Sequence, residues 1–118
     1  MEFLLLLYAD NAQFEKLSPA QASEAMNAYG AYTGALQNAG VLHGSNRLRP
    51  THTATTVRVK SGKSEVLNGP YAETREQLGG YYLIDVPDLD AALSWASRCP
   101  GANHGVVEVR PVWPRSEF

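Results

Sequence analysis

The spacing of apolar residues changes along the chain, and each spacing predicts a strand or a helix. Residues 3–8 form a continuous apolar run, which is typical of a central strand covered on both faces. Ser18, Pro19 and Gln21 then form a helix-capping pattern, and Gly40 is expected to close that helix in a left-handed conformation. The buried stripe of this helix is expected to be Ala22, Met26, Tyr29, Thr33 and Leu36.

The middle of the chain is predicted to be a series of short strands. Residues 41–43 start a strand that Arg49-Pro50 breaks. Residues 53–60 alternate branched and polar side chains, and Ser61-Gly62 is expected to turn the chain into a returning strand at 63–67. The other expected elements are a turn at 68–70, a polar loop at 72–78 followed by Gly79-Gly80, a strand at 81–86, a helix that Asp88 caps and Cys99-Pro100-Gly101 ends, and a strand at 105–112.

This order predicts an α+β fold, a ferredoxin-like β-α-β-β-α-β sheet with an added hairpin. We expect a single domain at 1–112 and a C-terminal tail at 113–118. Both long helices would cover one face of the sheet and leave the other face open. An open face can be covered by a second copy, so the expected partner is the chain itself, in a homodimer.

Net charge, the length of the apolar segments and the cysteine count limit which partners and which cellular location we expect. The chain has 118 residues, 10 of them basic and 12 acidic, for a net charge of -2. Nothing in this charge favours nucleic acid. No segment approaches the ~20 apolar residues that span a membrane, and the N-terminal run is too short for a secretory signal. With Cys99 as the single cysteine, no disulfide can form within the chain, and we expect a cytoplasmic protein.

Residues 68–80 read NGPYAETREQLGG, and this segment resembles the DGPFAETKEQLGG signature of the DGPF branch of the YCII-related family. The flanking segments at 54–58, 82–84, 96–100 and 107–111 agree with it, so the resemblance covers roughly residues 1–112. It implies a ferredoxin-like fold in a dimer of the dimeric α/β-barrel type. Some relatives are encoded beside sigma factors, and others resemble lyases or dehydrochlorinases with a proposed His-Asp pair.

The chain departs from the family pattern at two positions. Asn68 replaces the leading aspartate of the signature, and the helix carries Tyr29 where the YciI-like branch has a histidine. A His-Asp mechanism therefore does not transfer residue by residue.

Two groups of residues are candidates for ligand binding, together with Tyr8 and Tyr29, which can either belong to the core or line a pocket. A polar loop framed by glycines can approach a ligand closely or can cap its own backbone. On the open sheet face, Arg110 can hold a carboxylate or can form an ion pair that sets the dimer register. The ligand-binding candidates are Tyr8, Tyr29, Gly69, Pro70, Tyr71, Glu73, Thr74, Tyr81 and Arg110.

Weaker candidates for proton transfer are His52, Asp85 and Glu108. The histidines His43, His52 and His104 are scattered, so we expect no metal and no cofactor. Cys99 lies at the end of a helix, which favours a structural thiol.

Three hypotheses for function follow. The first is a homodimeric module that binds a small molecule or regulates through it, and the missing His-Asp pair favours it. The second is a cofactor-independent enzyme, lyase-like or hydrolase-like, on a small aromatic or carboxylated substrate. The third is an interaction domain whose open sheet face binds another protein.

Overall fold

A computed structural model describes all residues from 1 to 118. The first half of the chain forms β1 (Glu2–Ala9), α1 (Asn11–Glu15), α2 (Pro19–Asn38), β2 (Leu42–Arg47), the 3-10 helix η1 (Thr51–Thr53) and β3 (Thr55–Lys60). The second half forms β4 (Lys63–Asn68), β5 (Gln77–Asp85), α3 (Leu89–Arg98), α4 (Gly101–His104), β6 (Val106–Pro111) and the 3-10 helix η2 (Arg115–Glu117).

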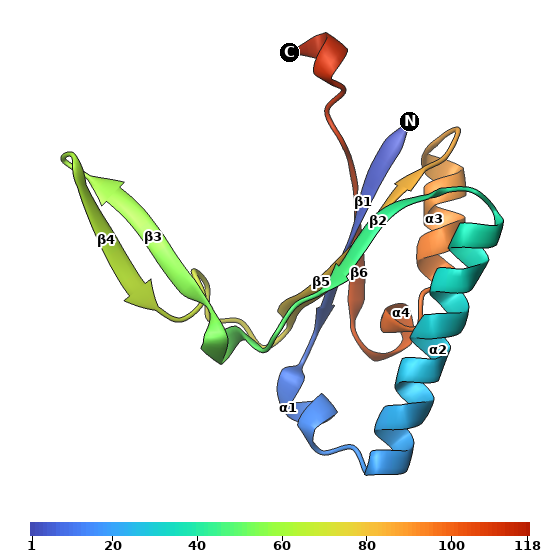
Figure 1. Ribbon diagram of the computed structural model, residues 1–118, viewed down its shortest axis with the longest axis horizontal. Helices are drawn as coiled ribbons and strands as arrows, with labels where there is room; N and C mark the ends of the chain where they lie inside the picture. Colours follow the sequence, from blue (N-terminus) through green and yellow to red (C-terminus); the bar gives the residue numbers. More distant parts are fainter.

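The body of the protein is an antiparallel sheet with strand order β2-β5-β1-β6. The long helices α2 and α3 lie together on one face of it, and the other face is open (Figure 1). The predicted α+β class with helices on a single face is confirmed, and the arrangement is compatible with a ferredoxin-like fold. No helix is both long and apolar enough to cross a membrane.

Strand alternation sorts the sheet into a packed face and an open face. Phe3 and Leu5 of β1, with Ile84 of β5, are completely buried beneath the helices. Leu36 of α2 and Cys99 after α3 are completely buried in the same core. The intervening residues of β5, namely Tyr81, Leu83 and Asp85, are only partly buried and lie on the open face, as the alternation predicts.

The predicted helix caps are present. Ser18 Oγ accepts from the Gln21 amide at 3.1 Å, and the Gln21 side chain returns a bond to the Ser18 amide. Asp88 caps α3 by accepting from the Ala91 amide at 2.9 Å. Gly40 follows α2 with φ of +71°, the left-handed conformation that glycine adopts at little cost.

Several sequence predictions need correction. The short helix α1 was not expected, whereas β2 (Leu42–Arg47) runs up to the predicted break at Arg49-Pro50. Met26 lies largely exposed, because the buried residues of α2 are Tyr32 and Leu36. Gly79-Gly80 does not bound a loop, since β5 already begins at Gln77 and shortens the predicted loop at 72–78.

Gly80 has a packing role inside the sheet. A Cβ at this position would lie 2.9 Å from the backbone oxygen of Asn46. The absence of a side chain therefore lets β2 and β5 pair closely, which explains a glycine in the interior of a strand.

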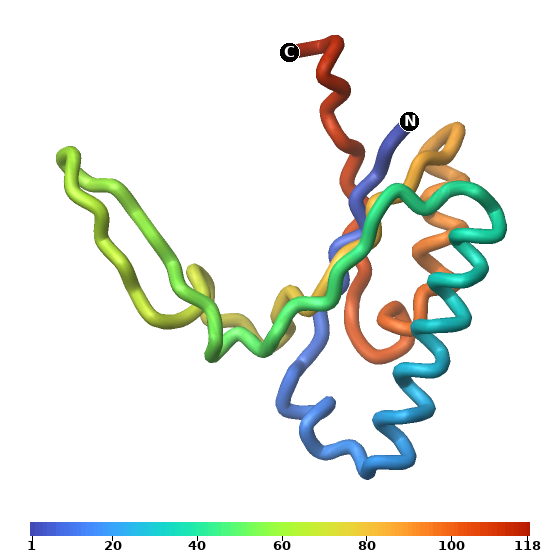
Figure 2. Tube along the Cα trace, viewed as in Figure 1, coloured from blue at the N-terminus to red at the C-terminus, as the bar shows by residue number.

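Strands β3 and β4 form a separate two-stranded sheet. This predicted hairpin is confirmed, with its turn at Ser61 and Gly62, both at positive φ. Figure 2 shows the hairpin as an arm that projects away from the sheet and helices. None of its residues is buried.

Two glycine substitutions should change stability in opposite directions. A Cβ at Gly105 would collide with the backbone oxygen of Tyr8, so Gly105→Ala should destabilise the protein by roughly 1–3 kcal/mol through overpacking. A Cβ at Gly34, in the middle of α2, meets nothing within 4 Å, so Gly34→Ala should stabilise by about 0.5–1 kcal/mol. Urea denaturation measures the free energy of unfolding of each variant. The same change in both variants would contradict the close packing at Gly105 and the open space at Gly34.

Candidate functional site

A cleft of about 740 Å³ lies between the middle of α2, helix α1 and the adjoining ends of β2 and β5. We call it the α2 cleft. Its apolar lining includes Leu7, Phe14 and Met26, and its polar lining includes Tyr29 and Arg47. A concave, largely apolar site with a few polar groups is the usual form of a small-molecule site.

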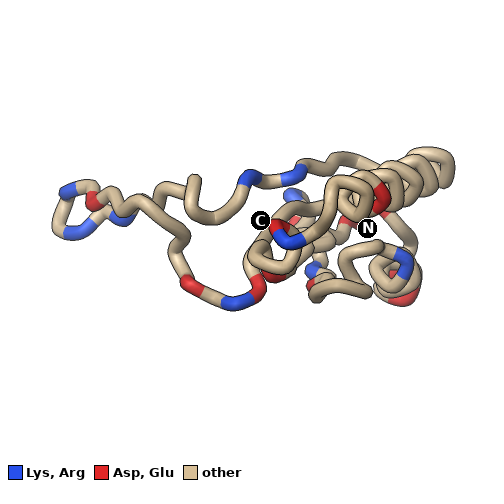
Figure 3. Tube along the Cα trace, turned by 90° about the horizontal axis from the view of Figure 1, so that it is seen from below, with Lys and Arg blue, Asp and Glu red and all other residues tan.

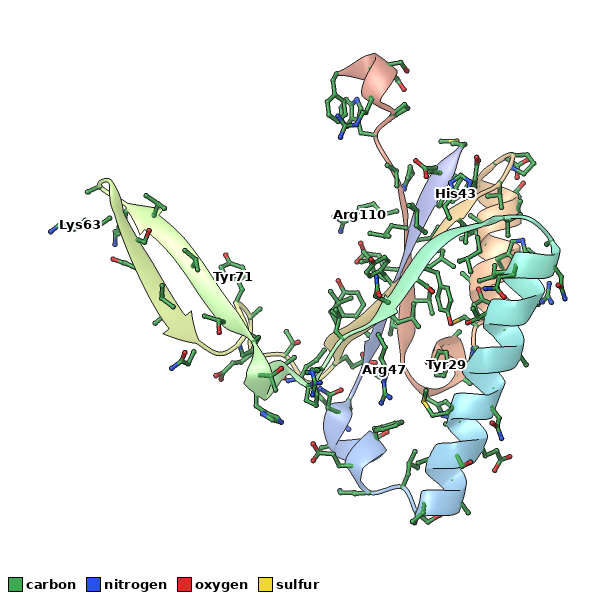
Figure 4. All side chains as sticks on the ribbon, viewed as in Figure 1. Tyr29, His43, Arg47, Lys63, Tyr71 and Arg110 are labelled. Carbon is green, nitrogen blue, oxygen red and sulfur yellow. The ribbon has the colours of Figure 1, made fainter.

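Arg47 is the cationic group of the α2 cleft. Its guanidinium lies 5.1 Å from the centre of the Phe14 ring, and its Nη1 is 3.7 Å from the Met26 sulfur. It forms no ion pair with a carboxylate of the chain. Figure 4 shows Arg47 and Tyr29 in the space between the sheet and α2. The guanidinium can therefore receive an anionic group from outside the protein.

The tyrosines around the cleft carry hydroxyl groups into an otherwise apolar region. The Thr33 hydroxyl donates to the Tyr29 carbonyl at 2.8 Å and lies 2.9 Å from the Tyr82 hydroxyl. The Tyr81 hydroxyl, by contrast, lies on the open face of the sheet, where it accepts from the Asn46 side-chain amide at 2.8 Å. The Tyr29 hydroxyl makes no hydrogen bond within the chain, so it remains free to bond a ligand.

Burial keeps these phenols protonated. Loss of solvation, followed by repulsion from Cys99 and Tyr82, raises the pKa of Tyr29 to about 12. Burial likewise raises the pKa of Tyr82, and the hydrogen bond between Tyr82 and Thr33 partly offsets this rise. At neutral pH both hydroxyls are hydrogen-bond donors rather than bases.

Gly101 makes room for Tyr29. A Cβ at Gly101 would lie 2.8 Å from the Tyr29 hydroxyl oxygen. The ring position at the end of the cleft therefore depends on this glycine in α4. Sequence reasoning did not connect the two residues, because they lie far apart along the chain.

A second depression, the polar recess, has a volume of about 430 Å³ and no hydrophobic lining. Asp10 Oδ1 caps α1 by accepting from the Ala12 amide at 3.0 Å, while Oδ2 lies 3.6 Å from Arg75 Nε. Thr74 donates to the Glu76 carbonyl. Asp10 and Thr74 are thus bonded within the chain, and Glu76 and His104 also line the recess.

The ligand candidates from the sequence separate into several places. Tyr29 and Tyr81 line the α2 cleft, and Thr74 lines the polar recess. Arg110 lies on the open sheet face and pairs with Glu108. The others lie elsewhere: Tyr8 at the end of β1, and Gly69, Pro70, Tyr71 and Glu73 in the segment between the hairpin and β5.

The catalytic candidates do not converge. His52 lies exposed in η1, Asp85 ends β5, and Glu108 lies within β6. Asp85 contacts the N-terminal ammonium at 2.7 Å, and this bond lowers the pKa of the carboxyl group. No interaction links His52 with either carboxylate.

Cys99 behaves as a core residue. It is fully buried, and burial raises the pKa of its thiol. No group of three or more His, Cys, Asp or Glu side chains is arranged to hold a metal ion.

Three cleft residues escaped sequence reasoning as site residues. Phe14 belongs to the unexpected helix α1, for which Asp10 as N-cap was the available signal. Met26 had been assigned to the helix core. Arg47 lies between the predicted start of this strand at 41–43 and its break at Arg49-Pro50, and strand periodicity alone did not show that its side chain would meet Phe14 and Met26.

Comparisons with known proteins agree with the sequence resemblance. The model of the YCII-related domain family matches residues 1–116. An uncharacterized protein of Rhizobium meliloti (strain 1021) is 39% identical over 114 residues, which cover 95% of this chain and 92% of the relative. The predicted family is confirmed.

The raised pKa of Tyr29 predicts a loss of stability at alkaline pH. Because the folded state holds this proton more tightly, its contribution is complete below pH 10.0 and disappears as pH rises to about 12. Tyr29→Phe should make the fall in unfolding free energy shallower across this window. Urea denaturation at a series of pH values measures the slope, and identical slopes in both proteins would contradict the burial of this phenol.

Proposed function

The chain belongs to the YCII-related domain family, and we propose that its α2 cleft binds a small organic ligand with an apolar or aromatic body and one carboxylate. The observation that carries this proposal is Arg47, a guanidinium without a carboxylate partner beside the apolar wall of Phe14 and Met26. The protein would act as a binding or regulatory module for this ligand.

The chemistry of the cleft suits such a ligand on both sides. Binding would bury the apolar body of the ligand against the apolar wall, which is favourable. The Arg47 guanidinium can donate two parallel N–H hydrogen bonds to the carboxylate of the ligand. The protonated Tyr29 hydroxyl supplies a further hydrogen-bond donor at the end of the α2 cleft. A volume of about 740 Å³ falls in the usual range for small-molecule sites.

Pairing of two copies is part of the proposal. The open sheet face carries the partly buried residues Leu4, Leu6 and Leu83, which a second sheet can cover. Such a pair would have the dimeric α/β-barrel arrangement. Sedimentation analysis measures the equilibrium between monomer and dimer. Leu83→Asp should weaken the dimer, because it places a charge in the interface between the two sheets.

A cofactor-independent enzyme on the same class of ligand is the second candidate. Glu15 lines the α2 cleft and supplies the one carboxylate there. If it acts as a general base, Glu15→Gln should abolish turnover of a bound aromatic carboxylate while leaving its affinity in place. Proton NMR of the ligand during incubation would record consumption, and a ligand that stays unchanged supports the binding module.

The binding proposal predicts a preference for an anionic probe. Benzoate should bind more tightly than benzyl alcohol, its neutral analogue, in a saturation-transfer NMR titration. Arg47→Gln should weaken benzoate at least ~10-fold, because a charge-assisted hydrogen bond is worth about 1.5–3 kcal/mol. The affinity for benzyl alcohol should remain unchanged.

Arg49→Gln is the matched control, since Arg49 is exposed and lies outside the cleft lining. It removes the same charge from the same segment. Equal weakening of benzoate by both substitutions would indicate nonspecific attraction and would refute the cleft assignment.

A further inference from the structure

The β3–β4 hairpin, residues 55–68, exposes apolar side chains on both of its faces, and we call it the arm. Val57, Val59 and Val66 share one face, because Val57 and Val66 are cross-strand partners. They are 61%, 66% and 61% exposed. Leu67 belongs to the opposite face and is 67% exposed. An isolated two-stranded hairpin is marginal in water, so these faces need a cover.

The whole molecule exposes more surface than a compact chain of its mass. Its accessible surface is 8400 Å², whereas about 6,300 Å² is expected for 12.9 kDa. The radius of gyration is 16.3 Å, against roughly 13.5 Å for a compact domain of this length. The excess of about 2,100 Å² exceeds the ~800 Å² that each partner buries in a standard stable interface.

The charge of the arm is opposite to that of the rest of the chain. The arm holds Arg58, Lys60 and Lys63 against Glu65, a net charge of +2, so the remainder carries -4 of the total of -2. Figure 3 shows the basic residues gathered around the free end of the arm. The acids Glu2, Asp85 and Glu108 lie on or beside the open sheet face. These acids already pair within the chain, with the N-terminal ammonium, His43 and Arg110, so the excess of exposed area, rather than charge, is what favours a second copy as the partner of the arm.

Two hydrogen bonds close the base of the arm. The Gly69 amide donates to the Ala54 carbonyl at 2.7 Å, and the Thr56 hydroxyl donates to the Gly69 carbonyl at 2.8 Å. Gly69 adopts a φ of +130°, which a residue with a side chain rarely adopts. Figure 4 shows Tyr71 at this base on the side of the sheet, while Arg110 points from the open face toward the arm. The two strands of the arm are thus tied together at its base, and the arm projects away from the sheet (Figure 1).

We propose that the arm is exchanged between two copies of this chain, with the valine face of each arm packed against the open-face side of the other copy's sheet. The inference rests on the pairing proposed above and is independent of the ligand of the α2 cleft. It adds a specific role for residues 55–68, which form no part of the buried core. The arm of each copy contacts the open sheet face of the other copy, so the two contacts are identical, as a two-fold symmetric dimer requires.

The test places a charge on the valine face of the full-length chain. Val57→Asp and Val66→Asp should each raise the dimer dissociation constant at least ~100-fold in sedimentation equilibrium. Circular dichroism should show unchanged folding, because neither side chain touches the core. Asn27→Asp, on the exposed surface of α2, adds the same charge and should leave the dimer unchanged.

Hydrogen–deuterium exchange gives a second, mutation-free readout. The backbone amides of 55–68 should be protected at concentrations that favour the dimer and should lose protection on dilution. A monomer at micromolar concentration would overturn both the pairing and the arm exchange. A dimer that Leu83→Asp breaks and Val57→Asp leaves intact would overturn the arm exchange alone, and sheet-to-sheet pairing would stand.

Discussion

One-sided coverage of the antiparallel sheet is the constraint on which the rest of the structure depends. Phe3, Leu5 and Ile84 point toward α2 and α3 and are fully buried, so nearly all hydrophobic stabilisation within one chain comes from this single layer. Tyr32 reinforces it by donating its hydroxyl to the Trp95 carbonyl at 2.7 Å and packing edge-to-face on Tyr82. The opposite face is left for interactions outside the chain.

The α2 cleft arises where this layer becomes incomplete. The N-terminal half of α2 extends past the packed residues Tyr32 and Leu36, and α1 closes the gap with Phe14. Arg47 reaches this place from β2, at the sheet edge. The proposed site therefore lies at the end of the core, where neighbouring residues hold the side chains in place and the surface is concave.

The arm and the open face represent the same unsatisfied requirement. Both present apolar side chains that no element of the chain covers, and the arm adds basic charge to an otherwise acidic protein. A pairing that covers both would bring the exposed area of each copy closer to that of a compact protein. The ion pair of Glu108 with Arg110 also lies on this face.

The sequence by itself determined the local features of this protein. Ser18 and Asp88 set the starts of the two long helices, Gly40 set the end of α2, and Ser61-Gly62 set the hairpin turn, because capping and turn chemistry act within a few residues. Strand alternation also identified the open face, and the signature at 68–80 identified the family.

Only the tertiary structure decided the site. The α2 cleft joins Phe14, Tyr29 and Arg47 from different elements, and Gly101 admits the Tyr29 hydroxyl from still farther along the chain. The tertiary structure also places the candidates His52, Asp85 and Glu108 in separate parts of the molecule. Periodicity reports which face of an element a residue occupies, whereas the strand order and the helix positions determine which faces meet.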